Sequence, residues 1–256
     1  VHDPTTGALL GAIDLTGGTQ VASSQTLALV RATAVAVENH LALLRVAGIG
    51  AEPAARKPHL VVLGGDRPRW VTTDGHGHLQ VTHLTGRHAD ILVLLSRHPE
   101  GLSADHLALL LDDKDLDVVT VRAEMSRLRK VIGADNLGSR PYRLRAPITS
   151  DIGEVFDALD RGDVDAALNR YSGPLLTHSV SPAVARLRTQ LSATLREAVL
   201  AESARGRTGL LRRWLELPEG RDDRAGWQAL RDSSGLTAAA RARADGHLAG
   251  LDFELG

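Results

Sequence analysis

The fold is decided by one basic stretch, DVVTVRAEMSRLRKVIG, at residues 117–133. Its apolar residues recur at helical spacing, which predicts a helix over Val118 to Ile132 with one buried stripe formed by Val118, Val121, Met125, Leu128 and Ile132. The residues between them then point outward, and several are arginine or lysine. We therefore expect a helix with an apolar inner face and a cationic outer face.

Two further helical patterns precede this stretch. Thr85 is a suitable N-cap for a helix through Ser96, whose buried stripe we expect to be Ala89, Ile91, Leu92 and Leu95. Ser103 can cap a second helix with inward side chains at Leu107, Leu110 and Leu111. Three short helices in succession are thus predicted.

Strand patterns flank these helices. Upstream, a small antiparallel sheet is predicted from strand-like runs at His59–Leu63, Arg69–Thr72 and His78–Thr82, with turns at Gly64-Gly65-Asp66 and Asp74-Gly75. Downstream, Gly138-Ser139-Arg140-Pro141 followed by Tyr142-Arg143-Leu144 is typical of a hairpin. The order of three helices and a basic hairpin is that of a winged helix-turn-helix.

The cationic helix face has the chemistry of a DNA-binding surface. An α-helix fits the major groove, where Arg pairs with guanine and Ser or Thr accepts several partners, so the base-contact candidates are Thr120, Arg122, Ala123 and Ser126. Phosphate contacts position a protein without reading sequence, and the candidates are Arg127, Arg129, Lys130, Arg140 and Arg143. An ordinary solvated helix face is the simpler alternative, but the helix pair and the basic hairpin favour DNA.

A resemblance supports this interpretation. The segment from LTGRHADILVLLSRHPEGLSADHLALLLDD through VRAEMSRLRKVIG to SRPYRL resembles the winged helix of OmpR/PhoB-type regulators. In that family the third helix enters the major groove, and the loop before it can contact RNA polymerase or its sigma subunit. The resemblance therefore implies such contacts for the acidic loop, at Asp112, Asp113, Asp115 and Asp117. Two departures are the lack of a receiver domain and of a Gly-rich hairpin tip.

The N-terminal 47 residues predict a hairpin and a dimer helix. Asp3-Pro4-Thr5-Thr6-Gly7 has turn chemistry, Leu9–Leu15 is strand-like, and Ser23 or Ser24 can cap a helix to about Val46. The a/d spacing of a coiled coil is shown by Leu27, Val30, Ala34, Val37, Leu41 and Leu44. Alternatively the helix packs on its own sheet, which the off-stripe residues Leu29, Val35 and Leu43 favour.

The run VHDPTTGALLGAIDLTG, with the helix that follows, resembles the last hairpin and exit helix of GAF sensor domains in AcoR-type regulators. This resemblance implies a sensor for a small-molecule effector upstream of Val1, and no ligand-binding residue is carried over onto this chain. Gly48–Pro58 is small, Pro-bearing and aperiodic, as expected of a linker.

From Asp151 onward the chain predicts an array of helices. Breaks are indicated at Gly162-Asp163, Gly173-Pro174, Ser181-Pro182, Gly206, Pro218–Gly220 and Ser233–Gly235. Ser181 before Pro182 is a helix start, and one face continues through Leu187, Leu191, Leu195 and Val199. RGDVDAALNRYSGPLL is similar to the start of the helical domain of actinobacterial SARP regulators. We expect a scaffolding or protein-contact role, with Trp214, Trp227 and Phe253 in the core.

Composition narrows the function classes. The chain has a net charge of -1 and no cysteine, so nucleic-acid binding requires a local basic patch and thiol chemistry is excluded. No apolar run approaches the roughly 20 residues of a membrane span, and a cytoplasmic location is expected. His76-Gly77-His78 lacks a partner for a metal, and Gly64-Gly65-Asp66 is a turn. We expect no enzyme, no cofactor and no metal.

These patterns predict a mainly α protein with small β elements. The expected domains are a GAF-like end with a coiled-coil helix at 1–47, a linker at 48–58, a winged helix-turn-helix at 59–147 and a helical domain at 148–256. The expected function is a homodimeric transcription regulator, more an activator than a repressor, that binds double-stranded DNA. The alternative is an adaptor that uses the same surfaces to bind polymerase or another protein.

Overall fold

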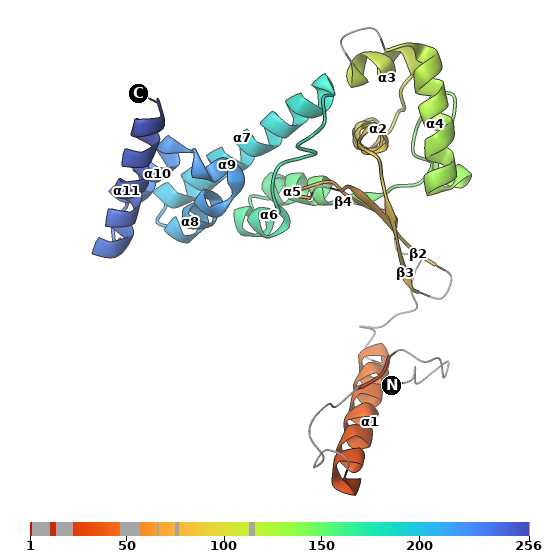
Figure 1. Ribbon diagram of the computed structural model, residues 1–256, viewed down its shortest axis with the longest axis horizontal. Coiled ribbons are helices and arrows are strands. Elements are labelled where there is room, and N and C mark those ends of the chain that lie inside the picture. The colour runs from red at the N-terminus through yellow and green to blue at the C-terminus, as the bar shows by residue number, and fades with distance from the viewer. Residues whose placement is uncertain are drawn as a thin grey trace. The chain divides into compact units, whose positions relative to one another are not determined.

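The computed structural model describes residues 1, 11–13, 23–46, 57–65, 67–74, 77–112 and 116–255. The chain divides into two compact units, residues 1–56 and 57–256. The described part is mainly helical, with one small mixed sheet and a C-terminal helical domain (Figure 1). The expected fold class, mainly α with small β elements, is confirmed at this level.

In the first unit the long helix α1 spans Ser24–Val46. The Ser23 hydroxyl accepts a hydrogen bond from the Thr26 amide, which makes Ser23 the cap. On the predicted stripe Leu27 and Val37 are exposed, whereas Val30 and Ala34 are half-buried. Several predicted features lie outside the described residues. They are the side chains of Leu41 and Leu44, the turn at residues 3–7, the linker at 48–56 and most of the strand predicted at 9–15.

The second unit begins with a four-stranded sheet of order β3-β2-β1-β4. Its strands are β1 at His59–Val61, β2 at Arg69–Thr73, β3 at Leu79–His83 and β4 at Thr149–Ser150. The predicted antiparallel pairing of the first three strands is confirmed, and β4, which was not predicted, adds to β1 in parallel. Leu60 faces Trp70 across the β1–β2 pair, and both side chains are buried in the core.

Three helices follow strand β3, and the first two begin at the predicted caps. Helices α2 (Gly86–Arg97) and α3 (Ala104–Leu111) are capped by the hydroxyls of Thr85 and Ser103. Helix α2 is buried on almost every side, from His88 to Leu95, which exceeds the predicted stripe. Helix α4 (Val118–Ile132) buries Val121, Met125, Leu128 and Ile132, but Val118 is only half-buried because it lies in the first turn. In α3, Leu110 is likewise half-buried.

The predicted hairpin follows α4 and the short 3-10 helix η2 (Ala134–Asn136). Leu137 and Leu144 form an antiparallel bridge, and the Gly138 amide donates to the Arg143 carbonyl at 2.8 Å. The second arm is also paired to the loop before α3, since Leu102 and Tyr142 exchange backbone hydrogen bonds of 2.8 and 2.9 Å. The hairpin tip at residues 139–141 therefore projects from a base that is held on both arms.

The C-terminal part is an array of helices (Figure 1). Their bounds are α5 Asp151–Asp160, α6 Val164–Arg170, α7 Pro182–Ala204, α8 Thr208–Glu216, α9 Pro218–Arg221, α10 Arg224–Asp232 and α11 Ala238–Leu255. Ser181 caps α7 with Pro182 in its first turn, as predicted. Trp214 and Trp227 are buried, but the placement of Phe253 in the core is wrong, because this side chain is 89% exposed on α11.

The sheet and the helical array share one hydrophobic core. The Asp151 carboxylate at the start of α5 accepts the Val62 and Leu63 amides, both at 2.8 Å. The Ser181 hydroxyl donates to the Leu110 carbonyl at the end of α3, at 2.8 Å. The domain boundary expected between residues 147 and 148 is therefore not a break in packing.

Gly64 lies where the chain after β1 and the helical array approach each other closely. Its φ is +63°, and a Cβ there would lie 2.2 Å from the carbonyl oxygen of Ser172. The glycine is required by this close approach of the helical array as well as by the predicted turn. Within the described residues, no helix is long and apolar enough to span a membrane.

Candidate nucleic-acid interface

The outer face of α4 carries the predicted DNA-contact residues. Thr120, Arg122, Ser126, Arg127 and Lys130 are exposed, and Ala123 is half-buried. They lie outside because the apolar stripe of α4 packs inward at a spacing of three and four residues. All of them are therefore placed on one continuous helical surface.

Five cations of this region have no internal partner. Within the described part of the chain, no side-chain hydrogen bond, ion pair or ring contact is made by Arg122, Lys130, Arg140, Arg143 and Arg145. Arg122 and Lys130 belong to α4, and the three others belong to the hairpin and its second arm. Since their charges are not neutralised within the protein, these side chains are available to an anionic partner.

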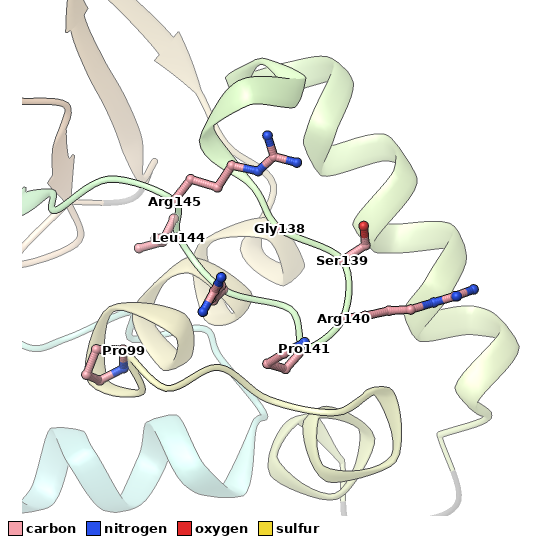
Figure 2. Close-up of a pocket in the computed structure, with 8 residues that line it drawn as sticks. Pro99, Gly138, Ser139, Arg140, Pro141, Leu144 and Arg145 are labelled. Atoms are coloured by element: carbon pink, nitrogen blue, oxygen red, sulfur yellow. The ribbon is translucent and has the colours of Figure 1, made fainter.

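The hairpin arginines surround an open concavity of 990 Å³, which is lined by Pro99, Gly138, Ser139, Arg140, Pro141, Arg143, Leu144 and Arg145. Figure 2 shows Arg140 leaving the turn of the hairpin and Arg145 leaving the far end of its second arm, with the loop at Gly138 running beside α4. The predicted contact set did not contain Arg145. The alternation of Arg143 and Arg145, two residues apart on one strand-like arm, is the signal that could have found it.

Arg127 differs from these cations because it is paired within its own helix. Its Nη1 forms a short ion pair with Glu124 Oε1, although 63% of the Arg127 side chain remains exposed. The other carboxylate oxygen of Glu124 lies 3.3 Å from Nε2 of His88 on α2, without hydrogen-bond geometry. Burial lowers the pKa of His88, and the nearby Glu124 carboxylate opposes that shift only in part. The charge of Arg127 is thus neutralised by Glu124, unlike the charges of the five unpaired cations.

Arg129 also departs from its predicted position. It is half-buried, its Nη2 donates to the Gly138 carbonyl at 3.1 Å, and its guanidinium lies 6.0 Å from the ring centroid of Tyr142. The expectation that Arg129 is a free outward cation is therefore wrong. The helical period correctly placed it off the buried stripe, but it gave no information about the hairpin packed against that side.

The acidic loop before α4 is described only in part. Asp113 and Asp115 lie outside the described residues. The Asp117 carboxylate accepts the Val119 amide at 3.0 Å and so caps α4, while Asp112 is half-buried at the end of α3. Two large apolar side chains near this loop are exposed, Leu109 by 71% and Val119 by 64%.

The pair of histidines that was weighed as a metal site, and judged not to be one, lies in the turn between β2 and β3. Among the described residues, no group of three or more His, Cys, Asp and Glu side chains is placed to hold a metal ion. His76 is outside these residues, and His78 Nδ1 lies 3.4 Å from Asp74 Oδ2. The Asp74 carboxylate also accepts the His78 amide at 2.9 Å, which is the chemistry of a turn.

Comparisons with known proteins give two findings. Residues 207–256, which cover α8 to α11, match the model of the YTH3-like protein, third C-terminal helical domain. The chain is also 48% identical over 229 residues to a Rhodococcus erythropolis protein described as "Uncharacterized 47.3 kDa protein in thcA 5'region". That alignment covers 90% of this chain and 50% of the relative, so the chain spans about half the length of the curated protein it matches.

Proposed function

We propose that residues 59–147 form a winged-helix module of a sequence-specific, DNA-binding transcription regulator. The observation that carries this proposal is the set of unpaired cations on α4 and the hairpin. The chain has a net charge of -1, so it has no general attraction to nucleic acid. Its unpaired cationic side chains are nevertheless concentrated on one surface, and such a surface is typical of a protein that binds a phosphate-rich partner.

In this proposal α4 enters the major groove with its outer face toward the bases. Arg122 pairs with guanine, and Thr120 and Ser126 accept or donate to neighbouring base edges. Lys130 and the hairpin arginines bind phosphates on either side and set the register of the helix. Ala123 is small enough to let the helix approach the groove closely.

The further parts of the proposal concern assembly and control. The exposed Leu27 and Val37 of α1 pack against a second copy of the chain, which gives a homodimer. A GAF-type sensor upstream changes the geometry of these helices when it binds a small-molecule effector, and two modules then occupy half-sites about 10 bp apart. The acidic loop contacts a basic surface of the polymerase sigma subunit, and the helical array is a scaffold for protein contacts.

One observation favours a second candidate function. Leu109 and Val119 are exposed apolar side chains next to the acidic loop, and a partner protein that covered them would bury their apolar surface. In this alternative the module is an adaptor that binds polymerase or another protein without DNA. Both functions use surfaces of residues 59–147, so an experiment must separate them.

A filter-binding titration with random duplex DNA does so. The regulator binds with micromolar or tighter affinity, and this affinity falls steeply as salt is raised because bound cations release counterions from the phosphates. The adaptor shows neither behaviour. Absence of salt-sensitive binding at low ionic strength would remove the regulator proposal and leave the adaptor.

A further inference from the structure

We infer that Arg129 is a positioning residue, which fixes the hairpin against α4 so that Arg140 meets the DNA at a set place. The inference deepens the proposed function and rests on it. It assigns to Arg129 a role different from that of Lys130, its exposed neighbour on α4, although both are cations of the last turn.

The contacts of Arg129 reach both arms of the hairpin. Its Nη2 donates to the carbonyl of Gly138 on the first arm at 3.1 Å. Its guanidinium lies 6.0 Å from the ring centroid of Tyr142 on the second arm, within the range of a cation–π interaction. A planar guanidinium can donate in its plane and present its face to an aromatic ring, which an ammonium group cannot do.

The opposite side of the hairpin is held by the loop between α2 and α3. Leu102 and Tyr142 exchange two backbone hydrogen bonds, as described above. Gly101 has a φ of +93°, and a Cβ there would lie 2.7 Å from Cγ of Pro141. The base of the hairpin is therefore packed tightly against the loop between α2 and α3. On the other side, Arg129 of α4 contacts the two arms of the hairpin.

Arg140 lies in the turn between the two arms that Arg129 contacts. It is exposed and makes no internal interaction among the described residues, so its position depends on the base of the hairpin rather than on its own contacts (Figure 2). Removing Arg129 leaves the Gly138 carbonyl and the Tyr142 ring without their partner from α4. The binding contribution of Arg140 then falls, because a mobile side chain loses more entropy on binding.

The test compares Arg129→Met and Arg129→Lys with Lys130→Met as the matched control, all in the full chain. Duplex binding is measured by fluorescence anisotropy over a range of salt concentrations. Both Arg129 variants bind about fivefold to tenfold more weakly with an unchanged salt slope, whereas Lys130→Met reduces the slope by about 0.9. Restored binding by Arg129→Lys, or a slope reduced by about 0.9 in Arg129→Met, would show that Arg129 is a phosphate contact and overturn the inference.

A double-mutant cycle separates positioning from a general loss of structure. If Arg129 acts through the hairpin, Arg129→Met costs much less affinity in an Arg140→Met background than in the wild type. Equal losses in both backgrounds would show that the two arginines act independently, contrary to the inference.

A measurement without DNA keeps this test separate from the proposed function. The Gly138 amide donates to the Arg143 carbonyl within the hairpin, and the Tyr142 amide donates to the Leu102 carbonyl of the loop before α3. Hydrogen exchange at these two amides accelerates in both Arg129 variants, while the buried amides of α4 keep their protection. Unchanged exchange at these two amides would overturn the inference even if the chain binds DNA. If exchange accelerates but the chain does not bind DNA, the result would still support the role of Arg129 in positioning the hairpin. It would contradict only the proposed function.

Discussion

Replacing Glu124 by Gln should tighten binding to random DNA, because the pair between Glu124 and Arg127 withholds one cation from the interface. If Arg122 reads a base, four unpaired cations remain for phosphates: Lys130, Arg140, Arg143 and Arg145. At about 0.9 per phosphate, they predict that each bound module contributes about -3.6 to the slope of log K against log salt, and freeing Arg127 moves this contribution to about -4.5. At 0.1 M salt, this difference corresponds to roughly eightfold tighter binding for each module that is bound.

The assay is anisotropy of a labelled random duplex at several salt concentrations. Glu197→Gln is the matched control, because it removes the same charge from another ion-paired glutamate, the partner of Arg196 on α7. Glutamine can still lie against the neutral His88 ring, so the melting temperature should change little. If Glu124→Gln leaves the slope at the wild-type value, or if Glu197→Gln steepens it equally, the pair does not control the charge of this surface.

Three further outcomes are expected. Arg122→Ala should lose about 1–3 kcal/mol on the specific site and much less on random DNA, and equal losses on both would refute its role in base reading. Changing Ala34 and Val37 to Glu should give monomers in light scattering, and an unchanged mass would remove the dimer role of α1. Because burial lowers the pKa of His88 below 6.5, the unfolded chain takes up a proton before the folded chain does as pH falls. The free energy of unfolding, measured with urea, should therefore fall between about pH 7 and about pH 5, and fall less in His88→Gln; equal losses would contradict a lowered pKa.

The helices of the proposed winged-helix module, and the start of α7 in the helical array, could be predicted because their signals are local. Thr85, Ser103 and Ser181 are caps whose hydroxyls accept an amide a few residues ahead, and α4 shows a regular apolar stripe. Such signals depend on neighbours in sequence, which is why the bounds of α4 match the predicted range. The hairpin was likewise indicated by its own turn residues.

The remaining features depend on contacts between distant segments. Strand β4 has two residues, too few to show an alternation, and it exists because Thr149 and Ser150 pair with β1. The pairing of Arg129 with Gly138 and Tyr142 needs the folded hairpin, so helical period alone assigned this arginine to the solvent. The pair between Glu124 and Arg127 has the three-residue spacing of helical ion pairs and could have been found.

The central claim is that the outer face of α4 meets DNA. Because the chain has no cysteine, Ser126→Cys provides a unique attachment point for a DNA-cleaving iron chelate on this face, and Gln190→Cys does so on the exposed surface of α7. If α4 lies in the groove, the chelate at residue 126 cuts a bound duplex in a short, localised stretch, and the chelate at residue 190 cuts it weakly. Stronger cutting from residue 190, or none from residue 126 at saturating DNA, would contradict this claim.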